Sequence, residues 1–346
     1  MEKTIKLAAT LALGSALIGT GASALAQEKI SIRMADYLPL THYLMRYGGT
    51  PWIEAVHRQS GGRVEIKHFP SEQLGKAKDL LSLTQSGVVD MSGVVPGFVS
   101  DRLPLSTVSE LPGQYKSACQ GTMATAPLVN GDGILAKEET DKLGVVPIFT
   151  LATPPYYLFS RREKLASLDD VKGLKVRTLG GVMTHTFQKL GAVGVQMALP
   201  EIYESLSRGT VDGLAYPFSP LISGGFHKIV KSVITDAYFG GANFTYFMNA
   251  KRWNALPADI QKIFLSAGEQ TMKTGCAAID KDTEEARGKA REAGVQFFPV
   301  SAGDKAKLDT IMDELAQGWV REVGAKRGKS AETVYKAYRD AVVRTN

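Results

Sequence analysis

The chain has 346 residues, of which 22% are charged and 44% hydrophobic, and its formal net charge is +6. This length exceeds one average domain and predicts two. The modest positive charge comes without a Lys/Arg run, which argues against nucleic acid as a partner. Beyond the N-terminal segment, no stretch is apolar for long enough to span a membrane.

The N-terminal residues have the pattern of a secretory signal peptide. Lys3 and Lys6 precede an apolar stretch over residues 7–18, and the sequence Ala-Leu-Ala at 24–26 has the small-x-small form of a cleavage site. Residues 1–26 are therefore predicted to be removed. The alanine-rich signal indicates export to a bacterial periplasm, where the mature chain is expected to be soluble and not itself membrane-spanning.

Strands and helices alternate in the first half of the mature chain. Strands are predicted over residues 30–35, 63–69 and 91–95, and helices from about residue 42 to 60 and from 76 to 85. The last strand is apolar almost throughout, as expected of a buried parallel strand. This alternation predicts an α/β fold.

The same pattern returns after Pro147. Strands are predicted over residues 148–151, 174–177 and 211–215, and a helix over residues 184–190. A weak internal echo relates the two halves, because a helix end, a glycine and a Val-Asp pair occur both at 83–90 and at 205–212. Two similar α/β units predict a cleft between two lobes.

The last hundred residues are mostly helical in pattern. A strand is predicted at 243–247, followed by an amphipathic pattern over 257–293 that is far longer than an average helix. One long helix lying along both lobes, or two helices with a bend, would explain this pattern. A further amphipathic helix is predicted over 304–323.

Arg177 is the strongest candidate for a binding residue. The alternation of Leu174 and Val176 predicts a short strand that ends at Arg177, and two glycines follow at 180–181. In open α/β sheets, ligands bind beyond the carboxyl ends of the strands. A guanidinium offers a planar fork of donors that matches a carboxylate. The pattern indicates a site for an organic acid, or alternatively a surface arginine that closes a strand.

The two cysteines and five histidines carry no catalytic or metal signature. Cys119 and Cys276 lie far apart on segments with helical patterns, and two buried free thiols are favoured over a disulfide. No histidine stands in a zinc-binding or nucleophile motif, and no phosphate-binding or dinucleotide-binding glycine loop is present. We therefore expect no enzyme activity, no metal and no cofactor.

Five segments together resemble the solute-binding proteins of tripartite ATP-independent periplasmic (TRAP) transporters. They are SEQLG at 71–75, LDDVKGLKVR at 168–177, PEIYESL at 200–206, GTVDG at 209–213 and WNALPADIQ at 253–261. The resemblance covers nearly the whole mature chain. It implies a periplasmic receptor that delivers an organic acid to the membrane subunits of a TRAP permease. A periplasmic sensor for a membrane receptor is an alternative, and an enzyme on the same fold is a weaker one.

The resemblance also implies a fold and a division of the chain. The fold is a two-lobed periplasmic-binding-protein fold, class α/β, with a long helix bracing both lobes. One lobe is expected to comprise residues 27–154 and 243–282, and the other residues 155–242 and 283–346. Arg177 matches the arginine that clamps the substrate carboxylate in this family.

Two departures from the family pattern bear on the solute. Tyr157 aligns where many relatives carry a second arginine, and Tyr216 stands where many carry an asparagine. One strong cation in a more aromatic lining favours a monocarboxylate with an apolar or aromatic body. Tyr37 and His42 follow the first strand and could contact the ligand or cap the next helix. Further wall candidates, each with core packing as the alternative, are Phe69, Phe98 and Phe218.

Overall fold

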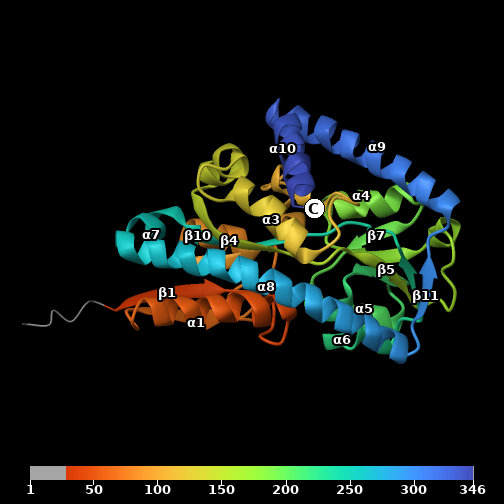
Figure 1. Ribbon diagram of the computed structural model, residues 1–346, viewed down its shortest axis with the longest axis horizontal. Helices are drawn as coiled ribbons and strands as arrows, with labels where there is room; N and C mark the ends of the chain where they lie inside the picture. Colours follow the sequence, from red (N-terminus) through yellow and green to blue (C-terminus); the bar gives the residue numbers. More distant parts are fainter. Residues whose placement is uncertain (1–28, 346) are drawn as a thin grey trace, which may run out of the picture.

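Two mixed β-sheets, each covered by helices, form the two lobes of the molecule. The computed structural model describes residues 29–345 (Figure 1). The first sheet has the strand order β2 (Val64–Phe69), β1 (Ile30–Ala35), β3 (Met91–Val94), β10 (Asn243–Asn249), β4 (Val145–Ala152). The second has the order β11 (Gln296–Pro299), β9 (Ser232–Thr235), β5 (Tyr157–Ser160), β8 (Gly213–Tyr216), β6 (Lys175–Thr178), β7 (Val193–Gln196). The expected two-lobed α/β fold is therefore confirmed.

The helices include several short irregular turns. The α-helices are α1 (Thr50–Gln59), α2 (Leu80–Ser86), α3 (Ala118–Val129), α4 (Gly181–Lys189), α5 (Leu199–Arg208), α6 (Phe218–Ser223), α7 (Ala250–Asn254), α8 (Ala258–Glu292), α9 (Ala302–Arg327) and α10 (Ser330–Arg344). The π-helices are η1 (Met45–Gly49) and η4 (Ala136–Thr140). The 3-10 turns are η2 (Pro96–Val99), η3 (Ser106–Glu110), η5 (Asp141–Leu143), η6 (Leu168–Val171) and η7 (Phe226–Lys228).

Most predicted elements are present, with shifted ends. The strand expected at 30–35 has those bounds, whereas α2 begins only at Leu80 instead of residue 76. The helix predicted from about residue 42 opens with the π-helix η1. A Cβ at Gly49 would lie 2.6 Å from the hydroxyl of Tyr246, so this turn packs too closely on β10 for a side chain there.

A single long helix, α8, contacts elements of both lobes (Figure 1). It packs on β4 at its N-terminal half, where Trp52 and Phe149 of the first lobe lie together with Phe264 in the core. Farther along, Asp282 accepts hydrogen bonds from Tyr47 of η1, at 3.1 Å, and from Ser219 of α6. The alternative of two helices with a bend is therefore wrong.

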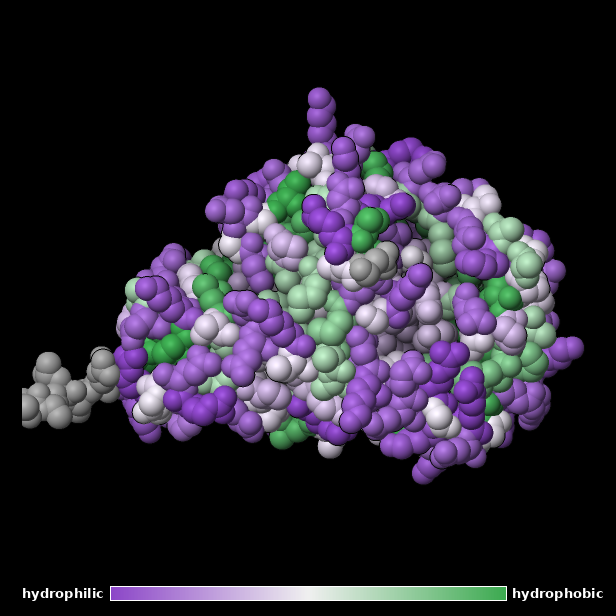
Figure 2. Space-filling model, viewed as in Figure 1, coloured by the Kyte–Doolittle hydropathy of each residue, from purple (hydrophilic) through white to green (hydrophobic). Residues whose placement is uncertain are grey.

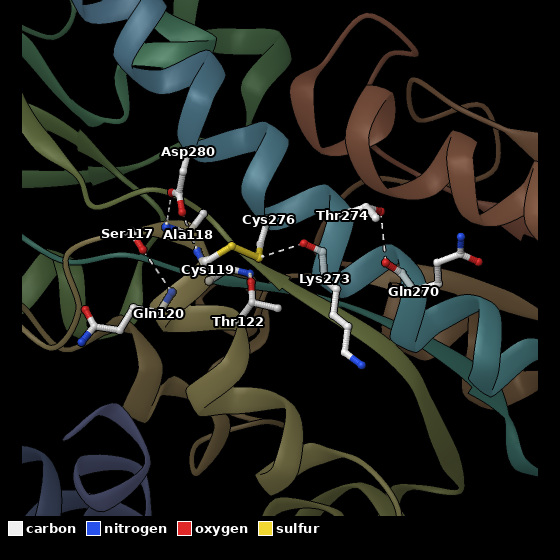
Figure 3. Close-up of a disulfide and its surroundings, with 11 residues drawn as sticks. Ser117, Ala118, Cys119, Gln120, Thr122, Gln270, Lys273, Thr274, Cys276 and Asp280 are labelled. Carbon is white, nitrogen blue, oxygen red and sulfur yellow. Dashed lines mark hydrogen bonds between the residues drawn. A yellow bond between two sulfur atoms is a disulfide. The ribbon is translucent and has the colours of Figure 1, made fainter. Parts of the chain in front are cut away.

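Cys119 and Cys276 form a disulfide, so the expectation of two free thiols is wrong (Figure 3). The bond joins the first turn of α3 to the middle of α8, where the two Cα atoms are 4.7 Å apart. Asp280, one turn farther along α8, accepts hydrogen bonds from the backbone N–H groups of Ala118 and Cys119 at 2.6 and 3.0 Å. The carboxylate thus satisfies free donors at the start of α3.

Hydrophilic side chains cover most of the face of the molecule seen in Figure 2, and apolar residues there lie in small groups. None of the helices in residues 29–345 is apolar over a length that could cross a membrane. The predicted signal peptide lies outside the described residues.

Candidate functional site

A small cavity of about 20 Å³ lies where the two lobes meet. The segments that follow β1, β3 and β4 border it from the first lobe, and the ends of β6 and β8 border it from the second. Its lining residues are Tyr37, Leu38, His42, Tyr43, Leu44, Val95, Thr153, Tyr156, Arg177, Leu179, Leu199, Tyr216, Pro217 and Pro220. A space of this size holds roughly one water molecule and is too small for an organic acid.

Arg177 carries a buried positive charge into this cavity. It is the penultimate residue of β6, and only 2% of its surface is exposed. Its Nε donates to the carbonyl of Met197 at 2.9 Å and Nη1 donates to that of Ala215 at 3.5 Å. No carboxylate of residues 29–345 forms an ion pair with Arg177. A buried cation without an anion is costly, and an anionic ligand would remove that cost.

His42 faces the same cavity as a neutral donor. Burial and the nearby charge of Arg177 lower the pKa of its imidazole to about 3. Its Nδ1 accepts a hydrogen bond from the backbone N–H of Leu44 at 3.3 Å, so the single ring proton stands on Nε2. The side chain therefore offers a donor N–H without adding a second positive charge.

Tyr156, and not Tyr157, borders the cavity. Tyr156 lies one residue before β5, where its backbone pairs with Gly240 and Phe239 at 3.0 and 2.9 Å. Burial raises the pKa of its hydroxyl to about 12, while Arg177 limits the rise. Neighbouring side chains of an extended segment point in opposite directions. The ring of Tyr157 accordingly packs away from the cavity, on Phe218 and Tyr238.

Tyr216 lies beside Arg177 at the end of β8. The guanidinium carbon of Arg177 is 5.3 Å from the centre of the Tyr216 ring, and the rings of Tyr156 and Tyr216 meet edge to face at 6.2 Å. Burial raises the pKa of the Tyr216 hydroxyl above its ordinary value. The two phenols are thus neutral at ordinary pH and can donate hydrogen bonds or stack on a ligand.

Of the other predicted residues, one lines the cavity and three do not. Tyr37 borders the cavity, and its ring packs edge to face on Phe98 at 5.6 Å. Phe98 supports that ring without reaching the cavity. Phe69 ends β2 beside Ala35, at the far edge of the sheet, and Phe218 is buried against Phe159. Phe69, Phe98 and Phe218 do not line this cavity.

Several lining residues had no signal in the sequence. Tyr43 and Leu44 directly follow His42, which the sequence did indicate, whereas Thr153 lies three residues before Tyr156, which it did not. Leu199 begins α5 and Pro220 lies within α6, and both helices belong to the second lobe. Their approach to Tyr37 and His42 depends on how the two lobes meet, which no local pattern reports.

The lining combines one cation, one neutral imidazole and several phenols with apolar side chains. No group of three or more His, Cys, Asp or Glu side chains in residues 29–345 is placed to hold a metal ion. Such a site suits a small molecule with one negative charge and an apolar body. A nucleophile–base pair is not among the lining residues.

Residues 41–322 match the bacterial extracellular solute-binding proteins, family 7. This match spans most of the sequence. The chain belongs to this family. The resemblance to TRAP solute-binding proteins is thereby confirmed, and the family consists of receptors that bind solutes.

Known relatives of this family 7 protein agree with its fold. The outer membrane transporter protein TsaT of Comamonas testosteroni is 26% identical over 313 residues, which cover 88% of this chain and 89% of TsaT. A marine metagenome TRAP solute-binding protein specific for aromatic acid ligands, solved with metahydroxyphenylacetate, superposes with a TM-score of 0.84 at 23% identity, covering 92% of this chain and all of that one. A TRAP solute-binding protein from Rhodoferax ferrireducens, solved with copurified benzoate, has a TM-score of 0.82 at 23% identity and coverages of 92% and 98%.

Proposed function

We propose that this protein is a periplasmic receptor that binds a monocarboxylate with an aromatic or bulky apolar body and delivers it, chemically unchanged, to a TRAP-type permease. The observation that carries the proposal is Arg177, a buried guanidinium without an acidic partner among the described residues. The carboxylate would take the N–H groups that the carbonyls of Met197 and Ala215 leave free. Export through the signal peptide at residues 1–26 is part of the same proposal.

The second half of the proposal concerns the body of the solute. Tyr37, Tyr43, Tyr156 and Tyr216 give the cavity an aromatic lining, and His42 is neutral. A second carboxylate would lose its water and find no second cation in this lining. An aromatic ring would instead bury apolar area, at roughly 25 cal/mol per Å². Two structurally similar receptors hold metahydroxyphenylacetate and benzoate, which supports an aromatic acid here.

The points where the chain crosses from one sheet to the other define the two proposed lobes. We propose that residues 27–154 and 243–282 move as one lobe and residues 155–242 and 283–346 as the other, except that α10 packs on α3 and η3 and would move with the first lobe. The chain passes between the sheets after β4, before β10 and along α8, so the hinge would lie in these three segments. Closure would then bring Tyr37 and His42 onto a solute that is held by Arg177.

A thermal-shift panel tests the proposed solute class. Benzoate, 3-hydroxyphenylacetate and mandelate should each raise the unfolding temperature more than succinate or malate does, because binding to the folded state alone stabilises it. Mass spectrometry of the acid recovered from the complex should find it unaltered. Stabilisation by succinate or malate without any response to the aryl acids would contradict the proposed solute class, and turnover of the acid would contradict the receptor.

The neighbouring residues Tyr156 and Tyr157 provide a matched pair of variants. Tyr156→Phe should weaken binding of an aryl acid by about five- to tenfold, because it removes a hydroxyl beside Arg177 and the ligand carboxylate. Tyr157→Phe removes the same atom from a ring that packs away from the cavity, so binding should change less than about twofold. Calorimetric titration of both variants makes the comparison. An equal loss in both, or a loss in Tyr157→Phe alone, would contradict the assignment of Tyr156.

A further inference from the structure

Glu110 is a buried acid at the junction of the lobes that the solute site does not use. It ends η3, and its side chain is fully buried. One oxygen, Oε1, accepts a hydrogen bond from the backbone N–H of Gly97 at 2.6 Å. The other, Oε2, is buried and has no hydrogen-bond partner within the described residues. A charged carboxylate in this position would bear an unsatisfied oxygen, so the site fits a protonated carboxyl better.

The walls around this carboxyl come from both lobes. Gly97 follows β3 of the first sheet, whereas Gly180 and Gly181 follow β6 of the second. A Cβ at Gly181 would lie 3.9 Å from Oε2 of Glu110, and a Cβ at Gly180 would lie 2.9 Å from the carbonyl oxygen of Gly97. The lobes therefore touch closely at this point.

A hydrogen bond crosses the junction beside Glu110. Gln196, at the end of β7, donates from Nε2 to the carbonyl oxygen of Gly97 at 3.2 Å and also to that of Leu179 at 3.1 Å. Gly97 is thus held by Glu110 through its N–H and by the second lobe through its carbonyl. Parting the lobes would break the hydrogen bond from Gln196, move α4 away from Glu110 and expose the carboxyl of Glu110 to water.

The ionisable groups around Glu110 would not neutralise a charge on it. Glu110 interacts electrostatically with the phenols Tyr115 and Tyr156, whose pKa values are raised mainly by burial and, to a smaller extent, by Glu110 itself. On α4, His185 is exposed and faces an outer groove. Arg177 lowers the pKa of Tyr156, whereas the pKa of Glu110 is shifted by burial and by the hydrogen bond from Gly97.

The environment of Glu110 therefore favours its neutral form when the lobes are closed. Burial raises the pKa of this carboxyl from 4.5 to about 8, and the hydrogen bond from Gly97 opposes the rise. With the lobes apart, water would reach the carboxyl and its pKa would return toward the ordinary value.

We propose that Glu110 is a proton-binding site coupled to solute capture, so that closing the lobes over the solute takes up one proton on this carboxyl. The proposal rests on the proposed function, because a carboxylate solute is what holds the lobes closed. Between the ordinary pKa of the open form and the raised pKa of the closed form, Glu110 holds one more proton when the lobes are closed. Below about pH 6.5 this uptake is offset by His42, which loses a proton when it is buried. From the ordinary pKa of His42 up to the raised pKa of Glu110, affinity should therefore weaken by up to about tenfold for each unit of rising pH, and it should level off above that range.

Titration calorimetry in buffers with different ionisation enthalpies, such as HEPES and Tris, counts the protons taken up on binding. The probe is benzoate, or 3-hydroxyphenylacetate if that acid gives the larger thermal shift. The titration is done at about pH 7.5, because His42 is then neutral with the lobes open or closed and releases no proton on closure. At this pH the wild-type protein should take up most of one proton. Glu110→Gln keeps the shape and the acceptor for Gly97, so it should still bind the probe but take up almost none. Glu204→Gln, the same change at an exposed position of α5, should retain the full uptake.

Two results would overturn the proposal: binding of the probe by the wild-type protein without proton uptake, or undiminished uptake in Glu110→Gln. Should Glu110→Gln fail to fold, the wild-type affinity measured from about pH 7 to 9 decides alone, and an affinity that does not change over that range would overturn the proposal. Absence of binding by every acid of the panel would instead contradict the proposed function, and the proposal would fall with it.

Discussion

Replacing Arg177 with alanine should weaken the binding of an aryl monocarboxylate more than about a hundredfold, because a charge-assisted pair in a closed site is lost. The guanidinium is fixed by the carbonyls of Met197 and Ala215 and has no acidic partner in the described part of the chain. Arg177→Lys keeps the charge but not the planar fork, so it should bind with intermediate affinity. Calorimetric titration with benzoate and 3-hydroxyphenylacetate measures both variants.

The control for this experiment is Arg161→Ala. Arg161 directly follows β5 in the same lobe and is exposed, so its loss should leave the affinity nearly unchanged. Thermal unfolding checks that each variant is folded before its affinity is compared. An Arg177→Ala protein that is folded and binds the acid as tightly as the wild type would exclude Arg177 from the site.

Removing the disulfide should destabilise the protein more than any of the other proposed substitutions. The bond between Cys119 and Cys276 closes a loop over a sequence separation of 157 residues. A loop of this length restricts the unfolded chain strongly, and its loss should lower the free energy of unfolding by about 4 kcal/mol. Denaturant unfolding of the double variant Cys119→Ser/Cys276→Ser, compared with the wild type, measures this difference.

The fold should survive that change, because Asp280 still accepts hydrogen bonds from the first N–H groups of α3. A reductant should destabilise the wild-type protein and leave the double serine variant unaffected, which separates the disulfide from the effect of two new hydroxyls. Equal unfolding midpoints for the oxidised wild type and the double variant would contradict the expectation.

The order of elements could be predicted from the sequence because each strand or helix carries its own period. The strand at 30–35 was indicated by its local pattern alone, whereas the pattern over 257–293 fitted either the single helix observed as α8 or two helices with a bend. The disulfide could not be predicted this way. Cys119 and Cys276 meet only because α3 and the middle of α8 pack side by side on β4, and that contact is a property of the assembled lobe.

Local sequence patterns were limited in the same way in predicting the single residues of the site. Tyr37 and His42 were indicated because they follow a predicted strand, and Arg177 because it ends one, whereas Tyr216 was indicated by the resemblance to the family. All four line the cavity. Tyr157 was chosen in place of its neighbour Tyr156, because similarity along the chain places a residue but not the direction of its side chain. Glu110 had no signal, since its surroundings come from both lobes.

The position of β10 sets an order in which the molecule can be completed. This strand lies between β3 and β4 in the first sheet, yet it follows the whole of β5 to β9 along the chain. A chain that emerges N-terminus first therefore presents β3 and β4 with unpaired edges until residue 249 is available. Strands β5 to β9 are all available by then, and only β11 of their sheet comes later. The lobe that begins the sequence is thus finished after most of the lobe that interrupts it, and its exposed strands are where a chaperone would be needed most.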